Sequence, residues 1–366
     1  HNVVGIPLTL VGAGLGALAA ASALSGVVSG PLADRYGRKP LMLVALSGSA
    51  ATFLGFAHVV GFGGYLAVSV GMGLAGSAMF DAARNAMVAD VTPSGRRSRA
   101  YGLVRVGGNA GWALGPMSAG LIAASAGSSG VVYRTLFTAT AILTALVVLA
   151  VALAVKESLP ALREQPVGLW GGGVRAALGD RSFVVLLGAG VLLYYVFTQD
   201  WQALPIYARN LVGVSDARIG LFLGANGLMV IALQLPVSYL IDRGSKVWAL
   251  LIGSGLFAAS SATLLLTHSF IGILVAFAGF FTLAEMVLEV AGAALAADLA
   301  PVRLRGTYLS LFGVCFGVAY GTSPVVAGFL LQAKLPQAIW TVQLAAAALA
   351  AAGLVLLHFR RRGSAK

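Results

Sequence analysis

Long uncharged stretches recur along the whole chain and limit its fold more than any other feature. There are eleven of them, and most approach or exceed the roughly 20 apolar residues that a helix needs to cross a bilayer. A membrane β-barrel would alternate polar and apolar residues, and these stretches do not. The sequence therefore predicts an all-α, polytopic membrane protein. The stretches are 12–32, 41–60, 61–80, 106–133, 135–155, 182–199, 219–241, 247–267, 270–284, 306–333 and 335–357.

The composition agrees with lipid as the main solvent of the chain. Only 10% of the 366 residues are charged and 59% are hydrophobic, whereas an average soluble domain carries about 25% charged residues. The formal charge of +12 would suggest a nucleic-acid partner for a soluble protein. In a membrane protein we assign it to loops on one side of the bilayer, and we expect no nucleic-acid partner.

Several kinds of chemistry find no support in the residues. The single cysteine, Cys315, excludes a disulfide within the chain and a multi-cysteine metal site. The four histidines lie at ends or in loops, so we predict no metal site and no catalytic histidine. No nucleophile with a neighbouring base is visible within the apolar stretches, and no phosphate-binding loop is present. We therefore expect neither an enzyme nor an ATP-driven pump.

The basic residues predict the orientation in the membrane. When the loops are assigned alternately to the two sides, 18 of the 24 Lys and Arg residues fall on one side, 4 on the other and 2 within the stretches. Because cytoplasmic loops carry the excess of Lys and Arg, the loop that contains Asp34 and the C-terminus should be cytoplasmic. We expect a multi-pass protein of the plasma (inner) membrane.

The chain divides into two similar halves. The longest polar segment, 156–181, contains two prolines and three consecutive glycines, which predicts a cytoplasmic linker between an N-terminal bundle, 1–155, and a C-terminal bundle, 182–366. The halves match at an offset of 208 residues without a gap, and an internal repeat is typical of transporters. The matched pairs are Asp34 and Asp242, Arg35 and Arg243, Asp81 and Glu289, Asp90 and Asp298, Pro93 and Pro301, Arg97 and Arg305, and Pro116 and Pro324.

The repeat also predicts a helix that this chain lacks. The stretch 182–199 corresponds to positions before residue 1, and residues 1–11 correspond to a loop of the second half. We therefore expect residues 1–11 to be a non-spanning lead-in, and about eleven of twelve helices to be present, as helices 2–6 and 7–12 of two six-helix bundles.

The strongest motif lies between the first two stretches. Residues 30–40 read Gly-Pro-Leu-Ala-Asp-Arg-Tyr-Gly-Arg-Lys-Pro, which closely resembles the signature loop of the major facilitator superfamily. The family also has an acid at the end of the fourth helix that pairs with the arginine of this loop, which matches Asp90 and Arg38. We hypothesise that Asp34, Arg35, Arg38 and Asp90 form a cytoplasmic latch that stabilises the outward-open state. An ordinary positive-inside loop and a solvated helix end are the alternatives.

A second motif occurs at residues 111–120, Gly-Trp-Ala-Leu-Gly-Pro-Met-Ser-Ala-Gly. It is similar to the fifth-helix motif of facilitator antiporters, with Ala119 in place of one glycine. The residues that carry it are Gly111, Gly115, Pro116 and Gly120. Glycines four residues apart share one helix face and allow close packing, so plain helix packing is the alternative. The resemblance implies export rather than import.

Ionisable residues within the stretches are candidates for proton coupling, since such groups are expensive in hydrocarbon and usually face a cavity or each other. Glu285 is the first candidate, with Glu289 and Asp81 as secondary ones. The alternatives are that Asp81 and Glu289 are solvated near the cytoplasmic mouth and that Asp81 is neutralised by Arg84. Further candidates line a substrate pocket, although the asparagines can equally hold helices together and the aromatic residues can be interfacial anchors. They are Arg84, Arg105, Asn109, Trp112, Tyr194 and Asn226.

The resemblance implies two bundles that rock about a central site, and an activity similar to that of drug:proton antiporters. We predict export of a small, partly apolar compound by alternating access, driven by the proton gradient without a cofactor. The expected partners are this substrate, protons and the bilayer, and we expect a monomer. An uptake symporter for a nutrient and a non-transporting membrane sensor are the alternatives. The residues do not identify the substrate.

Overall fold

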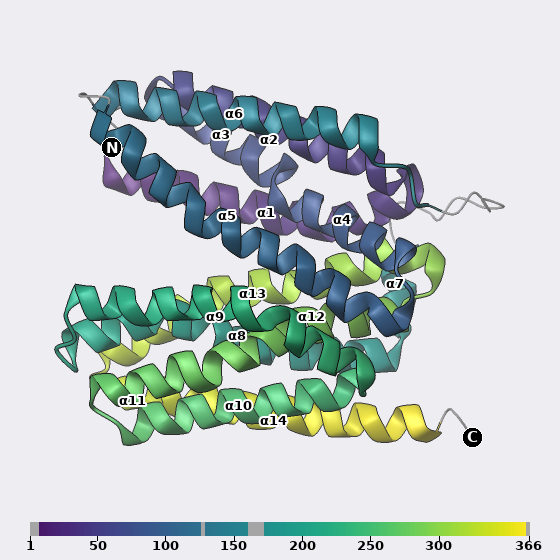
Figure 1. The fold of residues 1–366 in the computed structure, drawn as a ribbon, viewed down its shortest axis with the longest axis vertical. Helices are drawn as coiled ribbons and strands as arrows, with labels where there is room; N and C mark the ends of the chain where they lie inside the picture. Colours follow the sequence, from purple (N-terminus) through teal and green to yellow (C-terminus); the bar gives the residue numbers. More distant parts are fainter. Residues whose placement is uncertain (1–6, 126–128, 160–171, 364–366) are drawn as a thin grey trace. The chain divides into compact units, whose positions relative to one another are not determined.

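The computed structural model describes residues 7–125, 129–159 and 172–363, and every element in these ranges is helical (Figure 1). The long helices are α1 (Leu8–Tyr36), α2 (Arg38–His58), α3 (Gly61–Ala75), α4 (Ser77–Val91), α5 (Arg97–Ser125), α6 (Ser129–Ala154), α8 (Arg181–Asn210), α9 (Asp216–Arg243), α10 (Lys246–Leu266), α12 (Thr282–Leu299), α13 (Arg305–Gln332) and α14 (Pro336–Gly363). The short ones are α7 (Gly172–Gly179) and α11 (Phe270–Leu274), with 3-10 turns at Ser94–Arg96 and Val302–Leu304 and a π-helix at Val275–Phe281.

These helices form eleven long segments in the described part of the chain, because α3 continues into α4 after Gly76 and α11 continues through the π-helix into α12. Ten of the segments are long and apolar enough to cross a membrane. The eleventh is α5, whose first turns carry three arginines. The predicted all-α polytopic fold is confirmed.

The observed helices differ from the predicted stretches at several boundaries. The stretch 106–133 was expected to be one span that ends before Arg134, but α5 ends at Ser125 and α6 begins at Ser129, so Arg134 lies in the second turn of α6. A long basic side chain near a helix end can extend its charge toward water, so this arginine does not end the helix. At the other end, the expected lead-in 1–11 is partly helical, since α1 begins at Leu8 directly after Pro7.

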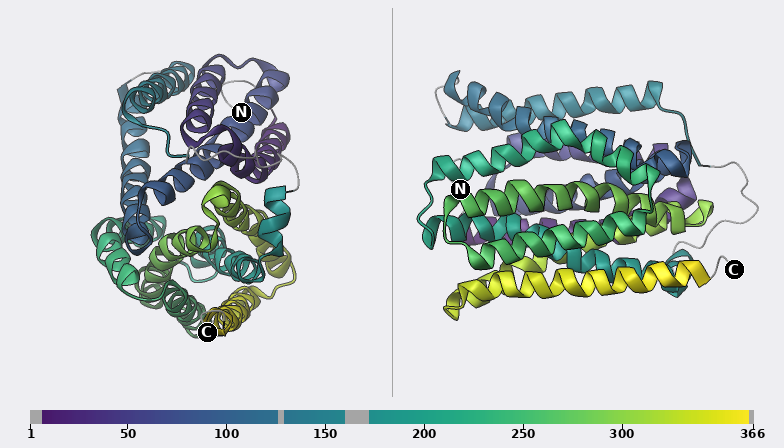
Figure 2. Two further views of the ribbon diagram at one scale, coloured as in Figure 1. Left: turned by 90° about the vertical axis from the view of Figure 1, so that its right-hand side faces the viewer. Right: turned by 60° about the horizontal axis from the view of Figure 1, so that its bottom comes forward.

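The chain forms two compact units, and each is a bundle of helices that run along one another (Figure 2). Unit 1 contains His1–Val91, Gly111–Arg175 and Ala300–Gly313, and unit 2 contains Thr92–Ala110, Ala176–Leu299 and Val314–Lys366. Two segments are thus exchanged between the sequence halves: the start of α5 belongs to unit 2, and the start of α13 belongs to unit 1. Of the predicted linker, 160–171 lies outside the described residues.

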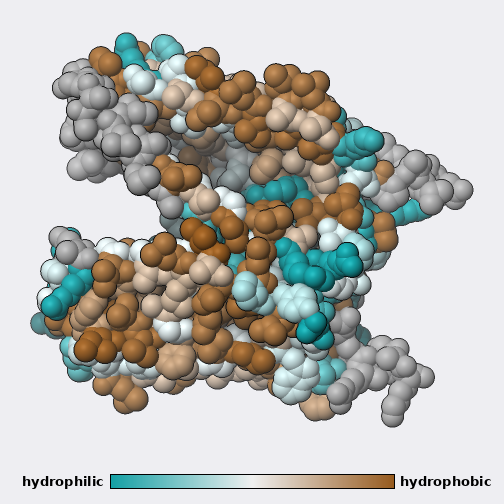
Figure 3. All heavy atoms as spheres, in the orientation of Figure 1, coloured by the Kyte–Doolittle hydropathy of each residue, from teal (hydrophilic) through white to brown (hydrophobic). Residues whose placement is uncertain are grey.

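Burial in each unit follows from packing among apolar helices. In unit 1, Ala33, Leu41 and Ala83 are buried at the junction of α1, α2 and α4. In unit 2, α12 is buried along nearly its whole length, with α10 and α9 beside it. Hydrophobic side chains cover most of the face seen in Figure 3, and hydrophilic ones form smaller patches. Such a surface suits a lipid solvent.

Candidate functional site

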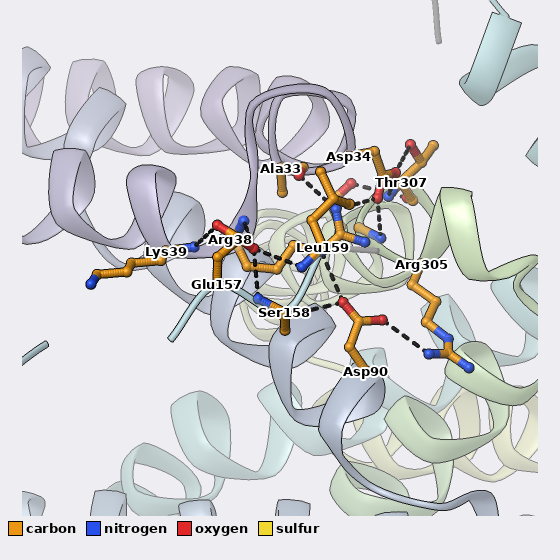
Figure 4. Close-up of polar contacts among 12 residues, drawn as sticks. Ala33, Asp34, Arg38, Lys39, Asp90, Glu157, Ser158, Leu159, Arg305 and Thr307 are labelled. Atoms are coloured by element: carbon orange, nitrogen blue, oxygen red, sulfur yellow. Dashed lines mark hydrogen bonds and ion pairs between the residues drawn. The ribbon is translucent and has the colours of Figure 1, made fainter. Parts of the chain in front are cut away.

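The signature loop places an aspartate against the start of α13, within unit 1 (Figure 4). The Asp34 carboxylate accepts hydrogen bonds from the backbone N–H groups of Gly306 (2.9 Å) and Thr307 (2.7 Å) and from the Thr307 hydroxyl (2.7 Å). The first N–H groups of a helix have no partner within the helix, and the helix dipole favours a negative charge there. Asp34 therefore caps α13, a helix of the other sequence half.

Arg38 joins this cap to a second carboxylate. Its guanidinium is fully buried, and it lies 3.0 Å from the Asp34 carboxylate and 3.1 Å from that of Asp90. It also donates to the carbonyl oxygen of Ala33 at 2.6 Å. The other Asp90 oxygen accepts from Arg305 of α13 at 2.9 Å. The structure thus brings together three of the four residues of the predicted latch in one buried network that includes α13.

The fourth predicted latch residue, Arg35, lies beside this network rather than in its centre. Its guanidinium carbon is 5.4 Å from the centre of the Tyr36 ring, on the partly exposed side of α1. Between α1 and α2, Gly37 has a φ of +108°, a backbone conformation that favours glycine. This turn allows α2 to begin directly at Arg38.

Sequence reasoning missed a carboxylate in this region, Glu157, which follows α6. It accepts hydrogen bonds from the backbone N–H groups of Arg38 and Lys39, both at 3.0 Å, and of Ser158 and Leu159, both at 2.8 Å. Partial burial raises the pKa of the Glu157 carboxyl, but the four N–H donors outweigh it and hold the pKa below its usual value. Glu157 thus caps α2 and ties the start of the linker to the signature loop. No motif marks it.

Unit 2 contains a second copy of the helix-capping cluster. The Asp242 carboxylate accepts from the backbone N–H groups of Ser98 (3.0 Å) and Arg99 (3.2 Å) at the start of α5. The Asp298 carboxylate pairs with Arg97, and with the Lys246 ammonium at 2.6 Å. Each of these residues is 208 positions from its counterpart in unit 1, so the predicted repeat is also a repeat of contacts.

A charged cluster lies inside the membrane-spanning part of unit 2. Arg105 of α5 pairs with two acids of α12: with Glu285, and with Glu289 at 3.0 Å. Asn226 of α9 donates to the second Glu285 oxygen at 2.6 Å and contacts the hydroxyl of Thr282 at 3.0 Å. The Glu285 side chain is 5% exposed and that of Glu289 is 31% exposed. Four of the predicted site residues therefore meet in one place.

Aromatic rings adjoin this cluster. Tyr194 of α8 lies beside Glu289, and its ring lies 6.2 Å from Phe197 and 5.7 Å from Phe316. Phe197 stacks on Phe281, at the end of the π-helix, with 5.8 Å between ring centres. An acidic group beside apolar rings can bind a molecule that is both cationic and partly apolar.

The other predicted residues have contacts of their own. Asp81 pairs with Arg84 on its own helix at 2.8 Å, and both side chains are partly exposed. Asn109 donates to the backbone oxygen of Arg105 at 3.0 Å, so it braces the helix turn that carries this arginine. Trp112 is 83% exposed.

The antiporter-type motif lies in α5. Among the described residues, a Cβ atom at Gly111 or Gly115 would meet no atom within 4 Å. Pro116 and Gly120 fall within α5, but their surroundings lie outside the described part of the structure. The role of the motif stays a prediction.

A comparison with protein families identifies the fold. The family model of the Major Facilitator Superfamily matches residues 2–207 and 200–366, nearly the whole chain. The chain belongs to the Major Facilitator Superfamily. It is therefore a multi-pass membrane transporter of the secondary type, and the resemblance of its signature loop to that of the family is confirmed.

Several proteins of this family are similar to the chain over most of its length. The uncharacterized MFS-type transporter YqjV of Bacillus subtilis is 27% identical over 317 residues, 85% of this chain and 75% of YqjV. A Na(+), Li(+), K(+)/H(+) antiporter of Planococcus maritimus is 24% identical over 337 residues (83% and 77%). The multidrug resistance protein MdtH of Yersinia enterocolitica is 26% identical over 328 residues (87% and 77%).

Solved structures show the same fold. The human organic anion transporter MFSD10 superposes with a TM-score of 0.76 at 20% identity, over 96% of this chain and 87% of MFSD10. At this identity the likeness concerns the fold alone.

Proposed function

We propose that the protein exports a small, cationic and partly apolar compound in exchange for protons, and that the cluster of Arg105, Glu285 and Glu289 couples the two movements. The observation that carries this proposal is that two acids share one arginine inside the membrane. When both acids are ionised, the cluster has one negative charge in excess. An unbalanced charge in this environment is costly and is neutralised by a bound cation.

Either of two cations can supply that charge. A proton that binds one of the acids balances the cluster, and so does the positive group of a substrate that lies against the aromatic rings near Tyr194. Because the two compete for one excess charge, release of one accompanies binding of the other. Glu289 is the better position for the exchange, since its side chain is more exposed than that of Glu285, which Asn226 also holds. This proposal places Glu289, a secondary candidate of the sequence analysis, ahead of Glu285, the first candidate.

The relatives support the direction of transport. The names of two of them describe multidrug resistance and the exchange of monovalent cations for protons. Together with the antiporter-type motif in α5, they favour export over an uptake symporter or a sensor. We place the protein in the plasma membrane with its C-terminus in the cytoplasm, on the basis of the 18-to-4 distribution of basic residues.

The test uses the purified protein in vesicles with an imposed pH gradient and a fluorescent lipophilic cation as the substrate. Wild-type protein should move the cation against the direction of proton flow. Glu289→Gln and Glu285→Gln each leave one acid with Arg105, a balanced pair, so both should abolish pH-driven transport and weaken binding of the cation. Asp81→Asn is the matched control: Asp81 is the repeat counterpart of Glu289 but is already balanced by Arg84, so transport should persist.

Proton-driven transport that is unchanged in both glutamine variants would refute the coupling role. Movement of the substrate in the same direction as the protons would establish the symporter instead.

A further inference from the structure

A second acid lies buried in unit 2, apart from the Arg105 cluster. Asp200 of α8 is fully buried. One of its carboxyl oxygens accepts a hydrogen bond from the side-chain amide of Gln343 of α14 at 2.7 Å. The other oxygen, Oδ2, is also buried, and it has no hydrogen-bond partner. Sequence reasoning missed Asp200, because it directly follows the apolar stretch 182–199 and resembles the start of a loop.

The surroundings of this carboxyl are polar but neutral. Ser261 of α10 donates to the amide oxygen of Gln343 at 3.0 Å, which turns the NH₂ group of Gln343 toward Asp200. The Ser260 side chain lies beside the same carboxyl, and its buried hydroxyl makes no hydrogen bond of normal geometry. Neighbouring Gln199 is fully buried, and neither its amide oxygen nor its amide nitrogen has a partner.

No cation lies near this carboxyl among the described residues. On α8 itself, Arg209 is nine residues away, about 14 Å along the helix. The basic groups of α10 and α14, Lys246, His358 and Arg360, lie at the opposite ends of those helices.

The other helices that contact α8 are α9, α12, α13 and the π-helix, and the charged groups on them have other partners or lie at helix ends. Arg305, in the first turn of α13, pairs with Asp90. Glu285, Glu289 and Asp298 are paired with Arg105, Arg97 and Lys246, and Asp242 caps α5. Arg218, Asp242 and Arg243 lie in the first or last turns of α9.

A bare carboxylate in such a place is too costly to persist, since an isolated charge in an apolar medium loses its hydration and gains no compensating partner. The charge is removed by a proton or balanced by a metal cation. A proton needs one nearby acceptor, and the Ser260 hydroxyl supplies it. A sodium ion would need several more oxygen ligands than Asp200, Gln199 and Ser260 offer.

We propose that Asp200 is a second proton-binding site of this transporter, and that its bound proton allows α8 to pack against α10 and α14. Loss of the proton at alkaline pH would leave a bare charge between these helices and loosen them. The proposal does not depend on the coupling role of the Arg105 cluster. The carboxyl lies nearer to the helix ends at Asn210, Leu266 and Pro336, which the charge distribution predicts to be on the outer side.

The first experiment follows thermal unfolding of the purified protein from mildly acidic to alkaline pH. The folded protein holds a proton that the unfolded chain releases, so raising the pH favours unfolding and lowers the midpoint. Asp200→Asn has the shape of the protonated acid without its titration, and should therefore lose the alkaline fall of the midpoint. Asp180→Ala is the control at the start of the same helix: it removes the side chain that caps α8 and should lower the midpoint while the alkaline fall remains.

The second experiment observes the proton directly by infrared spectroscopy. Wild-type protein should show the carbonyl stretch of a protonated carboxylic acid with a shift in D₂O, and this band should be absent in Asp200→Asn and present in Glu285→Gln. Gln343→Met keeps the acid and removes its hydrogen bond, so the band should move to higher frequency.

Three results would overturn the proposal. They are an alkaline fall of the midpoint that persists in Asp200→Asn, the absence of an acid band that depends on Asp200, and a rise of the wild-type midpoint on addition of sodium at fixed alkaline pH that Asp200→Asn lacks. The last result would assign the site to a metal cation.

Discussion

Replacement of Asp34 by Asn tests the capping of α13 by the signature loop. All four groups that contact this carboxylate are donors: two backbone N–H groups, the Thr307 hydroxyl and the Arg38 guanidinium. Whichever way the asparagine amide turns, its NH₂ group faces a backbone N–H, and Arg38 loses one of its two charged partners while it stays buried.

The magnitude follows from these losses. A hydrogen bond to a charged group contributes about 1.5–3 kcal/mol, and removal of one partner of a buried ion pair costs about 3–5 kcal/mol. We therefore expect Asp34→Asn to weaken the contact between the signature loop and α13 by about 3 kcal/mol. If the contact forms in one conformation of the transport cycle, this shifts the population on the order of a hundredfold.

The assay is transport in vesicles, with expression and thermal unfolding measured alongside. Asp34→Asn and Arg38→Ala should express and insert but lose most transport. Thr307→Val keeps both backbone donors and removes only the hydroxyl, so it should lose about 1 kcal/mol and retain partial transport. Near-normal transport by both Asp34→Asn and Arg38→Ala would refute the latch.

Three further predictions concern the same region and its orientation. Glu157→Gln should lower the free energy of unfolding by about 1 kcal/mol at neutral pH, as loss of a helix cap does. The pKa of Glu157 in the folded protein lies below the ordinary 4.5, so the wild-type advantage is present above pH 4.5 and should disappear as the pH falls through the folded pKa. Denaturant titration at several pH values measures this. Gly306→Val should abolish transport, since a Cβ there would lie 2.7 Å from a backbone oxygen of α1. Gly313→Ala on the same helix should be tolerated, since a Cβ there meets no atom of the described residues within 4 Å. Equal transport by the two variants would contradict this. Cysteines at exposed Ser94 and Ser245 should react with impermeant thiol reagents from the cytoplasmic side only, and labelling of intact cells would reverse the predicted topology.

The fold was predictable from the sequence because lipid imposes a simple rule on it. A spanning helix must be long and apolar, so the apolar stretches count the helices directly. The rule fails where a helix contains a charged residue, because the uncharged stretch ends before the helix does. The uncharged stretches end before Arg134 and Asp200, whereas α6 contains Arg134 and α8 extends ten residues beyond Asp200.

The sequence predicted which residues belong to the site better than it predicted which of these residues contact one another. Arg105, Glu285 and Asn226 were candidates because charged and polar groups within spans are rare, but no pattern pairs residues that are 180 positions apart in the chain. The contacts of Asp34 with Gly306 and Thr307 are hidden for a different reason. They use backbone N–H groups, which every residue except proline has, so no side chain marks them.

The internal repeat separates what serves the scaffold from what serves the chemistry. The capping clusters occur twice: Asp34 corresponds to Asp242, and Asp90 corresponds to Asp298, each with equivalent partners at an offset of 208 residues. A device present in both halves is required by the architecture that both halves share.

The cluster of Arg105, Glu285 and Glu289, in contrast, differs between the two halves. The counterpart of Glu289 is Asp81, which Arg84 neutralises on its own helix. In the second half the position equivalent to Arg84 is Gly292, so Glu289 has no such neighbour and instead shares Arg105 with Glu285. The counterpart of Glu285 is Ser77. One half therefore holds a balanced pair, and the other holds an excess negative charge that only a bound cation can neutralise. The shared fold does not require this difference, so we propose that it is connected with the transported ions. Glu289→Gln keeps the shape of the side chain and removes the extra acid, so it should abolish proton-driven transport while thermal unfolding stays close to that of the wild type. Proton-driven transport that persists in a folded Glu289→Gln protein would show that the excess charge is not the coupling element.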